Sequence, residues 1–276
     1  MRWKQFFTPV QSFDTDQARK YISANSYDAF TILDVRQPNE YKGGHIPGAK
    51  LIPLPDLTER LNEIDADKPA IVYCAIGGRS RVAAQILTVK GFDNVYNLSG
   101  GFKAWDSKAA FGGKEQGLEL FSGNESSEKT LIVAYSLEAG LRDFYLSMLP
   151  KISNEDVQKL FQKLSDIEVK HQERIFDEYL NLTGKSDTQA EFEKNVVVKA
   201  MEGGLTTEEY PSLFTVDWES VIDIIDLAMS IEAQALDLYM RAAEKSQNLQ
   251  SKNVLTQIAD EEQIHLKQLG KMIENL

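Results

Sequence analysis

The C-terminal half of this 276-residue chain contains an internal repeat, which constrains the fold more than any other feature. The segment Ala-Tyr-Ser-Leu-Glu-Ala, which contains Glu138, returns as Ala-Met-Ser-Ile-Glu-Ala, which contains Glu232, 94 positions later. We interpret this repeat as two copies of one supersecondary unit. The same offset relates two Glu-x-x-His pairs, each thirty residues after its glutamate: Glu168 with His171, and Glu262 with His265.

Each copy contains two stretches in which apolar residues follow the 3,4-spacing of an amphipathic helix. In the first stretch Glu138 lies between Leu131 and Tyr145 on the apolar stripe, and the other repeated residues are equally central in theirs. The sequence therefore predicts a four-helix bundle made of two helical hairpins and one long crossover. The expected helices are 128–149, 154–182, 217–246 and 250–274, with a crossover at 185–216 that contains a short helix at 189–201.

The repeated polar residues are predicted to bind metal. Four carboxylates buried without a counter-charge would each cost several kcal/mol, and two divalent cations would neutralise them. The i,i+3 spacing places the Glu and His of each pair on one helix face. A single Glu-x-x-His pair is usually chance or a surface pair, but two of them at one offset use two of the chain's three histidines. The predicted ligands are Glu138, Glu168, His171, Glu232, Glu262 and His265.

With this ligand set, the C-terminal half resembles the ferritin-like di-iron carboxylate proteins, and more narrowly the rubrerythrins. The resemblance implies two bound iron ions, with manganese left open, and reduction of peroxide or oxygen with electrons from an external donor. The sequence departs from the rubrerythrin pattern at Ala235, where an additional carboxylate is usual, and Leu141 is its counterpart in the first copy. Tyr145 and Tyr239 are predicted either to hydrogen-bond the glutamates across the site or to pack as ordinary core aromatics.

Composition excludes several classes of function. The net charge of −12 and the pI near 4.8 argue against a nucleic-acid partner or an anionic membrane surface. No apolar run reaches the roughly eighteen residues that span a bilayer. The single cysteine excludes an intrachain disulfide, fits a reducing cytoplasm, and excludes a four-cysteine iron site of the rubredoxin kind in this chain.

Residues 1–108 alternate short apolar runs with helix-like stretches, which predicts an α/β domain with a parallel sheet flanked by helices. A helix is expected at about 81–90. The expected strands are 29–33, 50–52, 70–73 and 95–98.

The strand at 70–73 continues into a loop, Cys74-Ala75-Ile76-Gly77-Gly78-Arg79-Ser80, that has the composition of an anion cradle. Its glycines allow a tight turn that points several N–H groups at one place, with a helix N-terminus behind them. Such a cradle lowers the pKa of a thiol at its centre, and Arg79 adds a planar cation for an oxyanion. The alternative is that Cys74 is an inert core cysteine, the commoner fate of a free cysteine.

About residues 10–108 resemble the rhodanese family, through Asp34-Val35-Arg36, His45-Ile46-Pro47-Gly48-Ala49, the Cys74 loop and Gly100-Gly101-x-x-Ala104-Trp105. The resemblance implies that Cys74 accepts sulfane sulfur and that Arg79 contacts a sulfonate such as that of thiosulfate. It also implies a structural role for His45. The related phosphatases use a loop one residue longer than the six from Cys74 to Arg79, so a phosphatase is not expected. The loop residues implied to bind the persulfide or donor anion are Ala75, Ile76, Gly77, Gly78 and Ser80.

The predicted organisation is a rhodanese-like domain at 1–108, a linker at 109–127 and a ferritin-like bundle at 128–276. The predicted function is sulfane-sulfur transfer through a Cys74 persulfide, together with peroxide or oxygen reduction at the di-metal site. An alternative of a different class is an iron-binding or redox-sensing protein whose rhodanese-like domain is regulatory. The expected partners are a sulfane-sulfur donor, a thiol acceptor and an external electron donor, and a homodimer is left open.

Overall fold

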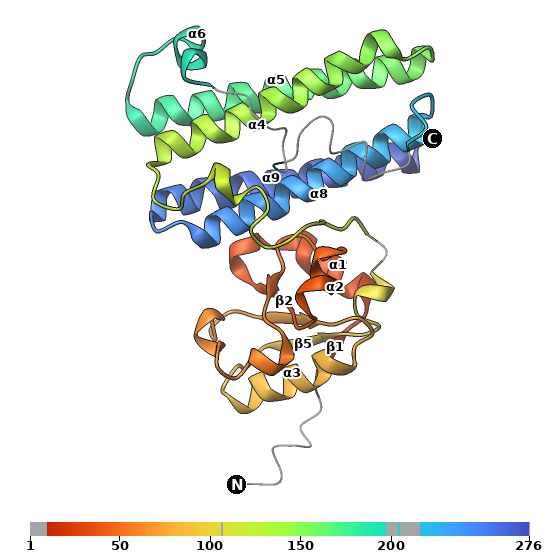
Figure 1. Cartoon of the computed structure of the whole chain (residues 1–276), viewed down its shortest axis with the longest axis vertical. Coiled ribbons are helices and arrows are strands. Elements are labelled where there is room, and N and C mark those ends of the chain that lie inside the picture. The colour runs from red at the N-terminus through yellow and green to blue at the C-terminus, as the bar shows by residue number, and fades with distance from the viewer. Residues whose placement is uncertain (1–9, 106, 197–203, 205–215, 276) are drawn as a thin grey trace. The chain divides into compact units, whose positions relative to one another are not determined.

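The computed structural model describes residues 10–105, 107–196, 204 and 216–275 (Figure 1). The chain divides into two compact units, Met1–Lys114 and Glu115–Leu276. The division falls inside the segment predicted as a linker, 109–127.

The described part of the N-terminal unit contains a sheet of five parallel strands in the order β1-β5-β4-β2-β3. All four residues of β4 are buried, as expected for a strand covered on both faces. Because the strands are parallel, their carboxyl ends share one edge of the sheet, and Cys74 follows β4 at that edge. The strands are β1 (Gln11–Phe13), β2 (Thr31–Asp34), β3 (Lys50–Leu51), β4 (Ala70–Tyr73) and β5 (Val95–Leu98).

Three α-helices accompany this sheet: α1 (Thr15–Ala24), α2 (Pro38–Lys42) and α3 (Gly78–Val89). Helix α3 begins earlier than the predicted start at 81, because the loop glycine Gly78 already has helical geometry. Strand β1 and helices α1 and α2 were not predicted. β1 has three residues, none of them buried, so it carries no apolar alternation that a sequence pattern could reveal.

The described part of the C-terminal unit contains four long helices, and short-range caps define where each begins. The side chains of Ser126, Asn154, Ser220 and Asn248 accept hydrogen bonds from first-turn N–H groups. Gly184, with φ of 64°, ends the second helix in a left-handed conformation. Among the described residues, no helix is long and apolar enough to cross a membrane. The helices are α4 (Ser127–Met148), α5 (Glu155–Thr183), α8 (Val221–Lys245) and α9 (Leu249–Glu274).

The long helices pack as two hairpins, α4 with α5 and α8 with α9 (Figure 1). The crossover between them includes α6 (Gln189–Phe192) and a 3-10 turn, Glu193–Asn195. Phe192 is fully buried and packs against Tyr135 and Tyr179, which fixes this part of the crossover. The predicted short helix at 189–201 is therefore confirmed only in its first part, and its remainder from residue 197 lies outside the described residues.

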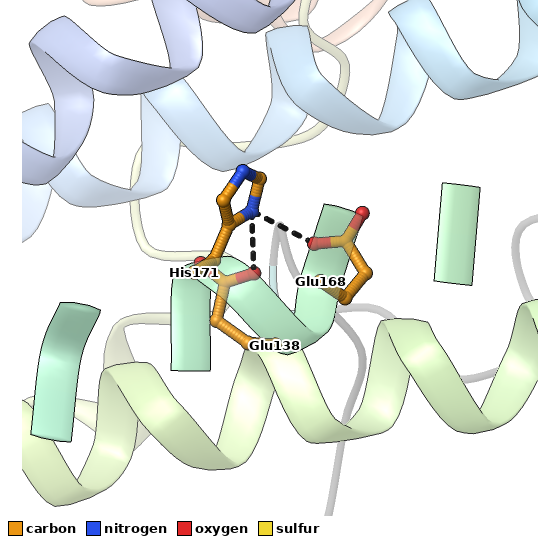
Figure 2. A group of neighbouring side chains, drawn as sticks. All are labelled: Glu138, Glu168 and His171. Carbon is orange, nitrogen blue, oxygen red and sulfur yellow. Dashed lines mark hydrogen bonds and ion pairs between the residues drawn. The ribbon is translucent and has the colours of Figure 1, made fainter. Parts of the chain in front are cut away.

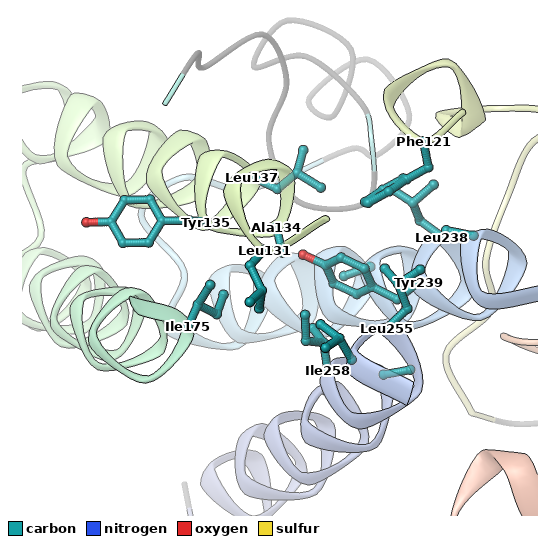
Figure 3. Packing of buried hydrophobic residues seen from close by; sticks show 14 of the residues in the cluster. Phe121, Leu131, Ala134, Tyr135, Leu137, Ile175, Leu238, Tyr239, Leu255 and Ile258 are labelled. Carbon is teal, nitrogen blue, oxygen red and sulfur yellow. The ribbon is translucent and has the colours of Figure 1, made fainter. Parts of the chain in front are cut away.

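The bundle core consists of two apolar clusters, with the predicted ligands between them. On α4, Leu131 and Ala134 belong to the first cluster and Leu141 belongs to the second, with Glu138 between. The same division recurs on α5, α8 and α9. Figure 3 shows the first cluster, in which Tyr239 of α8 packs with residues of the other three helices. The ligands thus form a polar layer with apolar packing above and below it.

Most of the predicted linker 109–127 is packed against one unit or the other. Ala110 pairs with His45 in the N-terminal unit through two backbone hydrogen bonds of 2.8 and 2.9 Å. In the C-terminal unit Phe121 is fully buried, and the Arg241 guanidinium donates to the carbonyl of Gln116 at 2.6 Å. Lys245 Nζ donates to the Phe121 carbonyl at 2.8 Å. These hydrogen bonds hold the segment that precedes α4 against α8.

We expect Phe121→Ala to destabilise the bundle by about 3 kcal/mol, because it removes a fully buried aromatic ring. The measurement is urea unfolding of the full chain followed by circular dichroism at the helix band. The control is Glu119→Ala, which changes an exposed side chain in the same segment. Equal unfolding midpoints for the two variants would show that the segment contributes nothing to bundle stability.

Candidate thiol and di-metal sites

Cys74 lies at the carboxyl end of β4, at the mouth of the loop that leads into α3. Its Sγ accepts a hydrogen bond of 3.1 Å from the N–H of Gly77. Gly77 has φ of 93°, in the left-handed region that favours glycine, and it is the residue that turns the loop into the helix. The thiol is thus held at a helix N-terminus with backbone amides directed at it.

The segment after β5 donates backbone hydrogen bonds to this loop. The N–H of Phe102 donates to the carbonyl of Cys74 at 2.7 Å, and the N–H of Lys103 donates to the carbonyl of Ala75 at 2.9 Å. A side chain at Gly101 would place its Cβ 2.3 Å from the Cys74 carbonyl oxygen. Glycine is therefore required at position 101 by the close approach of two backbone segments, whereas a Cβ at Gly100 would lie 2.6 Å from the Cβ of Ala104.

Burial raises the pKa of the Cys74 thiol, but hydrogen bonds from Ser80 and from the amides of Ile76 and Gly77 outweigh it and lower the pKa below its usual value. The Ser80 hydroxyl lies 3.5 Å from Sγ and 2.7 Å from Oδ1 of Asn97. Because a hydroxyl has one proton, the shorter contact with Asn97 takes it. The backbone amides of Ile76, Gly77 and Ser80 add to the stabilisation of the thiolate.

Arg79 is paired with a carboxylate that sequence reasoning did not identify. Its guanidinium makes two hydrogen bonds to Glu40 of α2, at 2.6 and 2.8 Å. This pairing lowers the pKa of Glu40 to about 2 and raises the pKa of Arg79, to which the charge of Cys74 also contributes. Arg79 is half-exposed, and Glu40 orients its planar fork beside the thiol loop.

The remaining residues of the thiol loop differ in exposure. Ile76 is 70% exposed and Gly78 is also exposed, whereas Gly77 and Ser80 are buried. The loop therefore presents its outer surface to solvent while its amides face the buried sulfur. Ala75 is intermediate in exposure.

His45 and the Asp34–Arg36 pair occupy buried positions with structural contacts. Nδ1 of His45 lies 2.9 Å from the carbonyl oxygen of Tyr41. The rings of the two residues stack, with their centroids 3.6 Å apart. Arg36 pairs with Asp34 at 2.7 Å and donates to the carbonyl of Gly44. These contacts tie the segments that follow β2 to one another.

In the bundle, the first predicted half-site is assembled from α4 and α5 (Figure 2). Nδ1 of His171 lies 2.9 Å from Oε2 of Glu168 and 3.3 Å from Oε2 of Glu138. Glu168 and His171 are three residues apart on one face of α5, and Glu138 reaches them from α4. Their donor atoms lie within 4.8 Å of one another, a separation at which they could hold one metal ion.

The second half-site repeats this arrangement on α8 and α9. Nδ1 of His265 lies 3.0 Å from Oε2 of Glu262 and 3.5 Å from Oε2 of Glu232. The two histidine rings stack at 4.0 Å with an interplanar angle of 8°. The six predicted ligands thus form two groups of three residues that the sequence repeat relates, and the stacked histidines bring the two groups together.

The cluster has the charge and hydrogen-bonding pattern of a metal site. The four glutamates are at most 3% exposed. Burial, together with the charges of Glu138 and Glu232, raises the pKa of Glu168 well above its usual value. Oε2 of Glu232 is buried and has no hydrogen-bond partner among the described residues. Oxygen and imidazole ligands suit a divalent transition metal, which would satisfy this oxygen and neutralise the carboxylates.

The positions next to the ligands are apolar. Ala235 occupies the position where rubrerythrins usually have an additional carboxylate, and Leu141 is its counterpart in the first copy. Both residues are fully buried in the two core clusters. Tyr145 and Tyr239 are also buried, Tyr145 beside Phe161 and Tyr239 beside Phe121. The rings therefore pack as core aromatics, and a role for their hydroxyl groups toward the glutamates stays a prediction.

The comparisons with known proteins follow this division into a thiol site and a carboxylate–histidine site. A family model for the rhodanese-like domain matches residues 14–108. The thiosulfate sulfurtransferase GlpE of Shewanella oneidensis is 39% identical over 96 residues, which are 35% of this chain and 95% of that protein. The uncharacterized protein YqhL of Bacillus subtilis is 51% identical over 82 residues, which are 30% of this chain and 65% of that protein.

Among solved structures, a rhodanese-like domain protein from Staphylococcus aureus is 30% identical, with a TM-score of 0.35, covering 37% of this chain and 98% of that one. Fold, sites and family models together define a rhodanese-like α/β domain joined to a ferritin-like helical bundle. A family model for rubrerythrin matches residues 129–273, more than half of the chain, and the chain belongs to that family. The family implies a di-iron site, where the two carboxylate–histidine groups could bind metal.

We expect Gly77→Ala to weaken the thiol cradle, because φ of 93° strains an alanine and its Cβ would lie 3.3 Å from the Gly100 nitrogen. The thiolate forms as the pH rises through the lowered pKa of Cys74, so the rate of alkylation by iodoacetamide should rise with pH and level off. Gly77→Ala should move this curve to higher pH.

The matched control is Gly78→Ala, since a Cβ at Gly78 meets nothing within 4 Å and its φ lies outside the left-handed region. Its alkylation curve should coincide with that of the wild type. If both variants shift the curve equally, the backbone geometry at Gly77 does not set the pKa of the thiol.

Proposed function

We propose that this protein transfers sulfane sulfur through a persulfide on Cys74 and reduces peroxide at a di-iron site in its bundle. The rhodanese-like and rubrerythrin domains support a combined sulfur and redox function in general. The observation that carries the sulfur proposal is the placement of a buried, amide-stabilised thiol at the start of α3. The observation that carries the redox proposal is the six-ligand cluster between the two apolar clusters.

In the proposed sulfur step, the Cys74 thiolate attacks the outer sulfur of thiosulfate. The S–S bond of thiosulfate breaks, sulfite leaves with the bonding electron pair, and Cys74 carries a persulfide. An acceptor thiolate then attacks the outer sulfur and releases Cys74 as a thiolate. The amides of Ile76 and Gly77 stabilise the negative sulfur in both states. Arg79, oriented by Glu40, attracts the departing sulfonate group.

The ligand set fits two iron ions. Glu138, Glu168 and His171 would hold one ion, and Glu232, Glu262 and His265 would hold the other. When bound, two reduced iron ions would supply the two electrons that peroxide reduction consumes. An external electron donor must restore them, because one cysteine cannot build a rubredoxin-type centre in this chain.

The protein itself contributes the surroundings of the metals. The apolar clusters on both sides of the ligand layer exclude bulk water along the bundle axis. Low polarity strengthens the attraction between the carboxylates and the cations. The histidine rings are the part of the cluster that solvent reaches, at 14% and 15% side-chain exposure.

Cys74→Ser should abolish thiosulfate:cyanide sulfur transfer, because the chain has no other cysteine to carry the persulfide. The measurement is thiocyanate release, with the persulfide detected by mass spectrometry of the intact protein. Metal content should be unchanged, since the thiol and the carboxylate cluster belong to different units. Sustained transfer by the serine variant would show that the sulfur chemistry lies elsewhere.

Glu168→Ala should bind less metal than the wild type, for which two ions per chain are expected. Metal removal should also lower the melting temperature of the bundle by roughly 5 °C or more, since a ligand at a hundred times its Kd contributes about 2.7 kcal/mol. The measurements are metal analysis and calorimetry.

Glu173→Ala is the control for this substitution, because Glu173 is an exposed glutamate on the same helix. It should retain full metal content and the melting temperature of the wild type. Equal metal content in Glu168→Ala and the wild type would contradict the proposed ligand set.

A second function is favoured by one observation, the apolar surroundings at Ala235 and Leu141, where no carboxylate supplements the six ligands. A centre with fewer anionic ligands suits an iron-binding or redox-sensing protein that changes state without turnover. Steady-state peroxide consumption with a supplied reductant separates the two functions. Continued consumption supports the peroxidase, whereas a single oxidation equivalent per site supports the sensor.

A further inference from the structure

The di-metal cluster is exposed along one edge only among the described residues, the seam between α5 and α9. The side chains of His171 and His265 are 14% and 15% exposed, whereas those of the glutamates are at most 4% exposed. The two rings stack at 4.0 Å across this seam. A solute that reaches the ligands must therefore pass beside the histidine pair.

One side of the histidine pair is covered by an ion pair between the same two helices. Nη2 of Arg174, three residues after His171 on α5, lies 2.5 Å from Oε2 of Glu261, four residues before His265 on α9. The two side chains are 33% and 24% exposed. A charge-assisted contact of this length holds the helices together at this point more strongly than a neutral hydrogen bond does.

On the other side of the histidine pair, the two positions equivalent to Arg174 and Glu261 hold residues that cannot form an ion pair. The repeat offset of 94 relates Arg174 to Gln268 and Glu261 to Ile167. Arg174 follows His171 and Glu261 precedes His265, whereas Ile167 precedes His171 and Gln268 follows His265. The two sets of residues therefore lie on opposite sides of the stacked histidines. Gln268 is exposed and Ile167 is intermediate in exposure. An amide and an isoleucine cannot form an ion pair, so no ion pair between these two positions closes that side.

We propose that small solutes, metal ions included, enter and leave the di-metal site on the side of Ile167 and Gln268, and that the Arg174–Glu261 ion pair closes the opposite side. The inference rests on the proposed metal function of the cluster. Passage on the closed side requires two opposite charges in a half-buried seam to separate, which costs Coulomb energy. Passage on the open side requires only displacement of an exposed amide and an aliphatic side chain.

The test measures how fast the full-length, metal-free protein takes up cobalt(II), followed by its visible absorption, and how fast it releases cobalt to excess chelator. Arg174→Gln makes the closed side resemble the open one. Both rates should increase by about fivefold, the factor that corresponds to the loss of an ion pair of this exposure. Arg174→Lys keeps the charge and should stay near the wild-type rates.

The repeat provides a second variant that acts in the opposite direction. Ile167→Glu combined with Gln268→Arg supplies the equivalent ion pair on the open side and should slow both rates by about the same factor, fivefold. The control for charge is Lys159→Gln, which removes a different ion pair of α5, with Asp156, and should change neither rate. Thermal melting by circular dichroism verifies that each variant is folded.

Faster uptake and release in Arg174→Gln with unchanged cobalt affinity, and slower exchange in the double variant, support the proposal. Wild-type rates in Arg174→Gln, or a change in affinity with unchanged uptake, overturn it. A double variant that exchanges cobalt as fast as the wild type places the entrance elsewhere and also overturns it. A folded wild-type chain that binds no cobalt at all contradicts the proposed metal function itself, which distinguishes that failure from a failure of the access route.

Discussion

The bundle depends on how it accommodates four buried glutamates. Their side chains lie in one layer, and apolar clusters fill the core on both sides of that layer. Four uncompensated carboxylates in such a place would destabilise the fold by more than typical packing recovers. The histidines offset part of this cost through contacts of about 3 Å with Glu168 and Glu262. The rest requires a shared proton or a cation. The raised pKa of Glu168 has the same origin, namely its burial and then the neighbouring charges of Glu138 and Glu232. The electrostatic interactions of the buried carboxylates therefore determine both the stability of this unit and its affinity for a cation.

The thiol site has a single negative charge to stabilise, and backbone N–H groups contribute to this stabilisation. These amides are fixed by the loop. The geometry depends on glycines at places where a Cβ would collide, such as Gly101 against the Cys74 carbonyl, and on the left-handed φ of Gly77. The two sites therefore fail in different ways when mutated. The thiol site is sensitive to backbone strain, whereas the carboxylate layer is sensitive to loss of charge balance.

Much of both sites could be predicted, because the signals are local or periodic. The offset of 94 located the residues of the carboxylate–histidine cluster, and strand 70–73 with its glycine-rich loop located the thiol. What could not be predicted depends on contacts between distant segments. Glu40 reaches Arg79 across 39 residues, and Asn97 reaches Ser80 across 17, and neither lies in a pattern that a single sequence displays. The full burial of Phe121 depends on packing against Tyr239 of α8, a residue far along the chain. The expectation that all six ligands face the core was right for the glutamates, whereas the histidines lie at its edge.

Comparison of the two copies of the repeat shows where equivalent residues of the bundle differ in burial and contacts. Asp143 and Asp237 are equivalent by the offset, yet Asp143 is exposed while Asp237 is fully buried against Arg241. The difference follows from the segment before α4, which lies on α8 and accepts a hydrogen bond from Arg241 at Gln116. No equivalent segment of the described chain fastens α4 in this way. Equivalent positions are therefore alike where they face the shared ligand layer and differ where each half meets its own neighbours. The Arg174–Glu261 pair follows the same rule, because it lies at the surface of the seam rather than within the layer.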